Sequence, residues 1–201
     1  MKIIRISVLF VGLIAAPLCS SAQAFADGTN LVSIGFGLPP GTKLTQTYDP
    51  NPSFTVYKLK NYGTGILRYE HGLNKYFGIG LNLEYSASSN VYDYDNNSNL
   101  LYSVTVNRSV FGGYLRMNGH FPVGDKLDFY AGVGLGYLYT VDNTNDSNPN
   151  TNLNTSHKNS VLDFDWQASV GARYMVKNGF GVFAEIGYAT TLCQVGVTLK
   201  F

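Results

Sequence analysis

Apolar and polar residues alternate one by one along eight stretches of the chain. In Cys193–Phe201, for example, the odd positions are apolar and the even positions are polar or glycine. This period of two is typical of a β-strand that turns one face to an apolar environment. The alternation predicts the other seven strands at Asn30–Leu38, Tyr62–Glu70, Tyr76–Ser86, Leu101–Asn118, Leu127–Thr140, Val161–Val176 and Phe180–Ala189.

The segments between these stretches alternate between short and long. Compact connectors lie at 72–75, 119–126 and 177–179, whereas long polar connectors lie at Pro39–Asn61, Ala87–Leu100 and Val141–Ser160. Short turns at one end and long loops at the other are typical of up-and-down barrels in membranes. Strands of about 9–11 residues are long enough to cross the bilayer when tilted. The pattern therefore predicts an all-β fold, a transmembrane up-and-down antiparallel β-barrel of eight strands.

The fourth stretch changes phase along its length. Phe111 and Leu115 indicate one apolar face, but Val104 and Val106 lie on the opposite one. A change of phase near residues 107–108 predicts either a β-bulge or a strand that continues beyond the membrane.

The first 24 residues have the features of a secretory signal peptide. A basic start with Lys2 and Arg5 is followed by an apolar run and then by small residues. The run is shorter than the roughly 20 residues of a membrane-spanning helix. We therefore expect residues 1–24 to be a signal peptide and residues 25–201 to form the barrel. Cleavage is expected after Ala24 or after Ala26.

Composition agrees with an exported β protein rich in aromatic residues. The chain has 15 Tyr, 12 Phe and 22 Gly, and only 13% of its residues are charged. Without Lys2 and Arg5 the formal net charge falls from +1 to −1, so bulk charge predicts no binding to nucleic acid. Cys193 is the one cysteine outside the signal peptide, which leaves no partner for an intramolecular disulfide.

Charged residues fall on the strand faces opposite the apolar ones. A soluble fold would leave this face in water, but a membrane barrel turns its apolar face to lipid and keeps a polar interior. An eight-stranded barrel is just wide enough for its interior to be filled by side chains, so buried charges there should pair. We expect a plugged interior whose charge network comprises Arg68, Glu70, Glu84, Arg116, Asp128, Asp163, Asp165, Arg173, Glu185 and Lys200.

With its eight alternating stretches and a last strand that ends on Phe201, the chain resembles the small eight-stranded bacterial outer-membrane barrels. This is the family of the OmpA transmembrane domain, OmpX and the opacity-type proteins, and the resemblance covers residues 25–201. It implies an outer-membrane location, contact with lipid and lipopolysaccharide, and recognition of the last strand by the barrel-assembly machinery. The residues of that assembly signal would be Val195, Val197, Leu199 and Phe201.

Candidate catalytic and metal-binding residues are few. His71 and His120 fall at predicted short turns and His157 in a predicted loop, so none is expected beside an inward serine. Asp163 and Asp165 share one face and could bind a divalent cation, but pairing with interior basic residues or solvation is the favoured interpretation. We therefore expect no catalytic residue, no metal and no cofactor.

These observations predict a monomeric, non-enzymatic integral outer-membrane protein with a structural or surface-interaction role. Its long polar loops are the candidate site for an extracellular ligand. A small porin-like channel for small solutes is the first alternative, because inward charges could line a narrow path. A lipid-modifying outer-membrane enzyme is the second.

Overall fold

The computed structural model describes residues 24–39, 54–96, 99–146, 156–177, 179–188 and 190–201. Across them no helix is long and apolar enough to cross a membrane. The described chain forms eight strands, which are β1 Asn30–Leu38, β2 Phe54–Gly72, β3 Phe77–Asn96, β4 Asn99–Val123, β5 Leu127–Asp146, β6 Ser156–Lys177, β7 Phe180–Tyr188 and β8 Cys193–Lys200.

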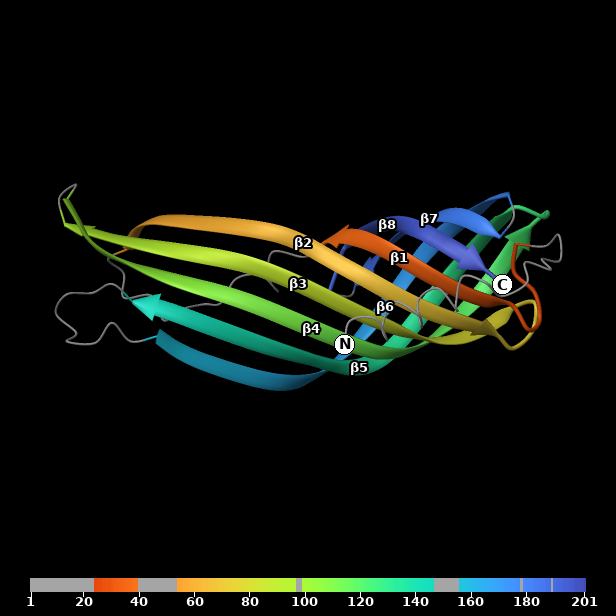
Figure 1. The fold of residues 1–201 in the computed structure, drawn as a ribbon, viewed down its shortest axis with the longest axis horizontal. Coiled ribbons are helices and arrows are strands. Elements are labelled where there is room, and N and C mark those ends of the chain that lie inside the picture. Colours follow the sequence, from red (N-terminus) through yellow and green to blue (C-terminus); the bar gives the residue numbers. More distant parts are fainter. Residues whose placement is uncertain (1–23, 40–53, 97–98, 147–155, 178, 189) are drawn as a thin grey trace, which may run out of the picture.

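The eight strands close into one antiparallel barrel, as the sequence predicted. Each strand pairs with the next along the chain, and β1 pairs with β8 to close the ring. Asn30 and Phe201 exchange both backbone hydrogen bonds at this seam, at 3.0 and 2.9 Å. The short connectors, the start of β1 and the C-terminus all lie at one end, which we call the turn end (right in Figure 1).

The outer surface of the barrel is apolar. Its outward side chains are half exposed, such as Leu81 at 54% and Leu135 at 61%. Aromatic side chains form two bands around this surface, as expected for the two interfaces of a membrane. The band at the turn end includes Tyr69, Tyr76, Phe77, Phe121, Phe129, Tyr174 and Phe180, and the band at the other end includes Phe36, Tyr62, Tyr85, Phe111, Tyr139 and Phe164.

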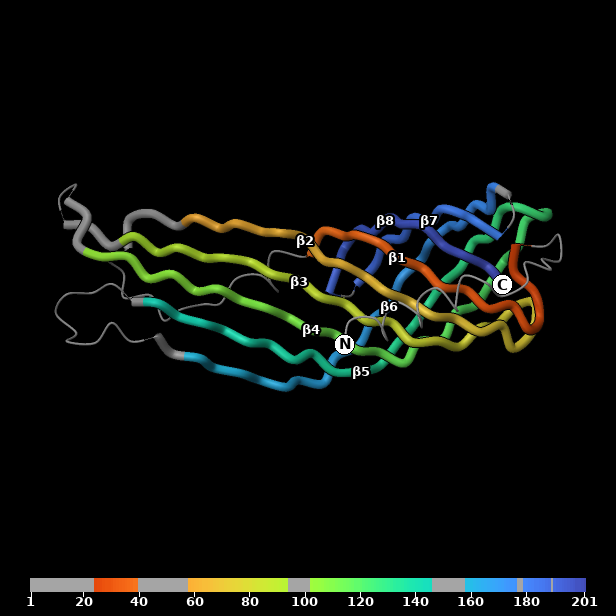
Figure 2. The backbone as a smooth tube through the Cα atoms, viewed as in Figure 1, coloured from red at the N-terminus to blue at the C-terminus, as the bar shows by residue number. Residues whose placement is uncertain are grey.

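Five strands continue well beyond the closed ring, which corrects the bounds of the three predicted long loops, whose residues 40–53, 97–98 and 147–155 lie outside the described part of the chain. Phe54–Gly63 of β2 precedes the first residue that pairs with β1, and Ser156–Gln167 of β6 precedes the first that pairs with β7. Between these two edges β3, β4 and β5 remain paired, so β2–β6 form a curved sheet that projects from the barrel (Figures 1 and 2). We call this part the extension; it is roughly 30 Å long at about 3.3 Å per residue.

The prediction of a β-bulge near residues 107–108 is wrong. The pairing of β4 with β5 runs from Val104 to Val123 without a register shift. Val104 and Val106 are buried on the same face as Tyr114, where they pack with Tyr92. The apolar residues of β4 switch from its outer to its inner face because this part of the strand lies beyond the apolar band. Its outer face therefore does not need to be apolar. β4 instead continues beyond the apolar band, which is the other alternative that the sequence left open.

A bulge does occur in β2, at the point where β1 ends. The pairing of β2 with β3 shifts between Asn61 and Thr64. Gly63 adopts a φ of +79°, and a Cβ there would overlap the ring of Phe36. The side chain of Asn61 accepts a hydrogen bond of 2.7 Å from the backbone N–H of Gly63. Only glycine fits this position without strain, because L-residues with a side chain rarely adopt positive φ.

Candidate functional site

Two arginines share one glutamate in the middle of the barrel. Arg68 of β2 and Arg116 of β4 both donate to Glu185 of β7, with shortest N–O distances of 2.9 Å for each pair. Ser169 accepts a further hydrogen bond of 2.7 Å from Arg116, and Gln194 donates to Glu185. All three charged side chains are at most 2% exposed. We call this group the central cluster.

A second ionic cluster lies next to it, nearer the turn end. Arg173 of β6 contacts Glu70 at 3.1 Å and Asp128 at 3.2 Å. His120 of β4 lies between the same two carboxylates, with Nε2 2.8 Å from Glu70 and Nδ1 2.8 Å from Asp128. The four side chains come from β2, β4, β5 and β6 and are almost fully buried. We call this group the lower cluster.

Asn118 connects the two clusters. Its Oδ1 accepts a hydrogen bond of 2.6 Å from Arg116, and its Nδ2 donates to Glu70. The network therefore spans the lumen from β2 through β4 to β6 and β7. Buried charges are tolerated when they are paired and hydrogen-bonded, and removal of one partner typically costs about 3–5 kcal/mol.

The remaining predicted network residues lie apart from these clusters. Tyr114 Oη donates a hydrogen bond of 2.8 Å to Asp165, and Asn82 donates one of 2.6 Å to Glu84. Lys200 is buried on the inner face of β8. Asp163 is exposed and lies on β6 before Ala168, the first residue that pairs with β7. The structure thus brings Arg68, Glu70, Arg116, Asp128, Arg173 and Glu185 together and leaves Asp163 outside.

The histidine positions correct the sequence analysis. His71 lies in β2 and His120 in β4 rather than in turns, and His157 falls within the bounds of β6. The sequence does contain a signal for His120, because it follows Tyr114, Arg116 and Asn118 at steps of two. That period places its side chain in the interior.

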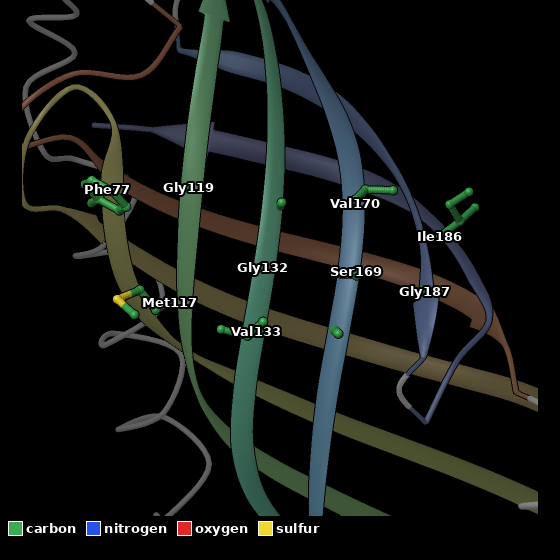
Figure 3. A pocket seen from close by; sticks show the side chains of 11 residues that line it. Phe77, Met117, Gly119, Gly132, Val133, Ser169, Val170, Ile186 and Gly187 are labelled. Carbon is green, nitrogen blue, oxygen red and sulfur yellow. The ribbon is translucent and has the colours of Figure 1, made fainter.

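The outer wall of the barrel carries apolar hollows between its strands. A hollow of about 640 Å³ lies on the outer surface of β4–β7, where Met117, Val133, Val170 and Ile186 contribute apolar side chains (Figure 3). It forms because the small residues Gly119, Ala131 and Ala168 lie between these larger ones. Within the described part of the chain, no group of three or more His, Cys, Asp and Glu side chains could hold a metal ion.

Comparison with known proteins agrees with this architecture. The family model of the outer membrane protein beta-barrel domain matches residues 9–201. The chain therefore belongs to this family and is a protein of the bacterial outer membrane, which confirms the resemblance expected from the sequence. No curated protein matches the chain.

Two similar solved structures are of Ail, the attachment invasion locus protein of Yersinia pestis. One, in complex with the heparin analogue sucrose octasulfate, is 11% identical and has a TM-score of 0.46, over 87% of this chain and 96% of that one. The other is 12% identical and has a TM-score of 0.42, over 87% and 95%.

Proposed function

We propose that the protein is a non-enzymatic outer-membrane anchor that presents a surface for interaction outside the cell. The observation that carries this proposal is the extension, in which β2–β6 continue beyond the barrel. In this family of folds the short turns face the periplasm and the longer connections face outward. The extension would then project from the cell, with a barrel filled by the central and lower clusters holding it in the membrane.

The two edges of the extension are the proposed interaction sites. Among the described residues, Phe54–Gly63 pairs only with β3, and Ser156–Gln167 pairs only with β5. An unpaired edge can accept an extended segment of another protein through backbone hydrogen bonds. Lys58 and Lys60 on one edge and Lys158 on the other are exposed. Charges of this kind disfavour pairing between two copies of the same edge, so a partner strand with acidic residues would suit them better.

An added negative charge on the edges should therefore weaken binding of an acidic partner strand. We expect Leu59→Glu, on the β2 edge, or Ser160→Glu, on the β6 edge, to reduce adhesion of expressing cells by about tenfold if one repelling charge costs the interface about 1.4 kcal/mol. Adhesion is measured on a panel of purified matrix proteins and glycans. The matched control is Asn107→Glu, which adds the same charge to an exposed position of the central strand β4. Equal adhesion by all variants, or by cells without the protein, would overturn this function.

The same architecture argues against the porin-like alternative. Because the central cluster reaches across from β2 and β4 to β7, we expect the purified barrel in planar bilayers to show a conductance close to that of the bare membrane. Arg116→Ala should raise the conductance if the ion pairs close the path. Steady conductance in the wild type, unchanged in the variant, would favour a channel instead.

The other assignments from the sequence remain proposals. We infer that residues 1–24 act as the export signal, and that the barrel is monomeric and surrounded by lipid and lipopolysaccharide. The assembly machinery would recognise β8, in which Val195, Val197 and Leu199 face outward and are exposed. The wide hollow on the outer surface would be filled by lipid chains, which is not the arrangement of a lipid-modifying active site.

A further inference from the structure

The segment before β1 folds back across the turn end of the barrel. Gly28 donates a backbone hydrogen bond of 2.9 Å to Gly72, and Gly72 donates one of 2.8 Å to Thr29. Thr29 also donates to the carbonyl of Ala26 at 3.2 Å, and its side chain accepts from Ala26 N–H at 3.1 Å. Residues 26–29 therefore form a turn that is fixed to the end of β2.

This turn directs Phe25 into the barrel. Its ring stacks on the imidazole of His120, with a centroid distance of 3.5 Å and an interplanar angle of 9°. Phe25 is fully buried, with 0% of its surface exposed. A Cβ built on Gly78 would lie 3.0 Å from Cζ of Phe25, so the site has room for the ring because position 78 carries no side chain.

The ring lies directly over the lower cluster. His120 bridges Glu70 and Asp128, and Arg173 contacts the same two carboxylates. Interactions between charges strengthen when water is excluded, and they weaken when solvent reaches them. The ring of Phe25, buried and stacked on His120, covers the cluster on that side.

We propose that the side chain of Phe25 closes the lumen at the turn end, a role that we call the stopper. We also propose that export processing hydrolyses the Ala24–Phe25 bond. Water adds across this peptide bond, which leaves a carboxylate on Ala24 and an amino group on Phe25. Cleavage after Ala26 would remove Phe25, whose ring stacks on His120. It would also remove Ala26, which forms two hydrogen bonds with Thr29. A barrel cut there would lose a buried aromatic residue, a class of loss that typically destabilises strongly. The mature protein therefore keeps residues 25 and 26.

The first test is the intact mass of the wild-type protein purified from outer membranes. We expect a mature chain that begins at Phe25. A chain that begins at Asp27, lighter by one phenylalanine and one alanine residue, would overturn the proposal without any variant. This result is independent of whether the extension binds a partner.

The second test measures access to His120 in the folded protein. A reagent that acylates imidazole is added, and labelling of each histidine is followed by peptide mass spectrometry. We expect His120 to be protected in the wild type and Phe25→Ala to raise its labelling rate by about tenfold or more, since local opening sets such rates. His71, which is partly exposed, is the internal reference.

Two further variants distinguish a stopper from general loosening. Phe25→Trp should retain protection, because it keeps an aromatic ring over the imidazole. Leu73→Ala, at an exposed position in the neighbouring turn, should leave the labelling rate of His120 as low as in the wild type. The intact mass of each variant must show that residue 25 is retained. If His120 in the wild type is labelled as fast as in Phe25→Ala, the stopper is excluded.

Discussion

Glu185→Ala is expected to destabilise the barrel by about 3–5 kcal/mol, because it leaves two buried arginines without their shared carboxylate. Arg68 and Arg116 both contact Glu185 at 2.9 Å, and neither is more than 2% exposed. Arginine stays charged, so these side chains cannot escape the cost by losing a proton. The measurement is the urea midpoint of the purified barrel in lipid vesicles, which should fall clearly below that of the wild type.

An exposed ion pair provides the control for Glu185→Ala. Lys58 contacts Asp93 at 3.1 Å, but its side chain is 68% exposed. Pairs of this kind are typically worth about 0–1 kcal/mol, so Lys58→Ala should shift the midpoint little. If Glu185→Ala and Lys58→Ala shift the midpoint equally, the central cluster does not hold the barrel together.

Leu135→Arg is expected to cost about 2–4 kcal/mol, the typical penalty for a basic residue on the lipid face near the middle of a bilayer. Leu135 is 61% exposed and lies between the two aromatic bands, opposite Leu115 of β4 and Trp166 of β6. On a protein surrounded by water, the same change at an exposed leucine would be almost neutral. The amount of folded protein in outer membranes and the urea midpoint should both decrease.

Asn107→Arg adds the same side chain outside the apolar band, on β4, which pairs with the strand that carries Leu135. Asn107 is exposed and belongs to the extension, opposite Ser89 of β3 and Asn143 of β5. We expect its stability to stay within about 0.5 kcal/mol of the wild type, as for an ordinary surface change. A large loss of stability with Asn107→Arg, or no loss with Leu135→Arg, would mean that the membrane boundary lies elsewhere on the barrel.

The part of the fold within the apolar outer band could be predicted from the sequence. The predicted bounds of the first strand agree with β1, and those of the last two differ from β7 and β8 by one residue. An apolar outer face and a polar inner face impose a strict alternation on these strands. In the extension both faces of a strand can be polar, so the segments before Tyr62 and after Thr140 show no clear period of two and the sequence predicts loops there.

The site was only partly predictable for a related reason. Alternation identifies inward residues, but their partners depend on how far neighbouring strands are staggered around the ring. Arg116 contacts Glu185 of β7, and Arg173 contacts Glu70 of β2, although both pairs are distant in sequence. Phe25 could not be found from periodicity at all, because it belongs to no strand and reaches His120 only through the turn at 26–29.

The unbroken pairing of β4 with β5 affects how the protein would respond to mechanical load. Because backbone hydrogen bonds lie across the strands, a pull along the extension would load many of them in shear at once. No register shift separates the extension from the barrel along this pair, so the two should move as one stiff body rather than bend at a joint. A tether attached at the far end would therefore transmit tension into the membrane-embedded ring.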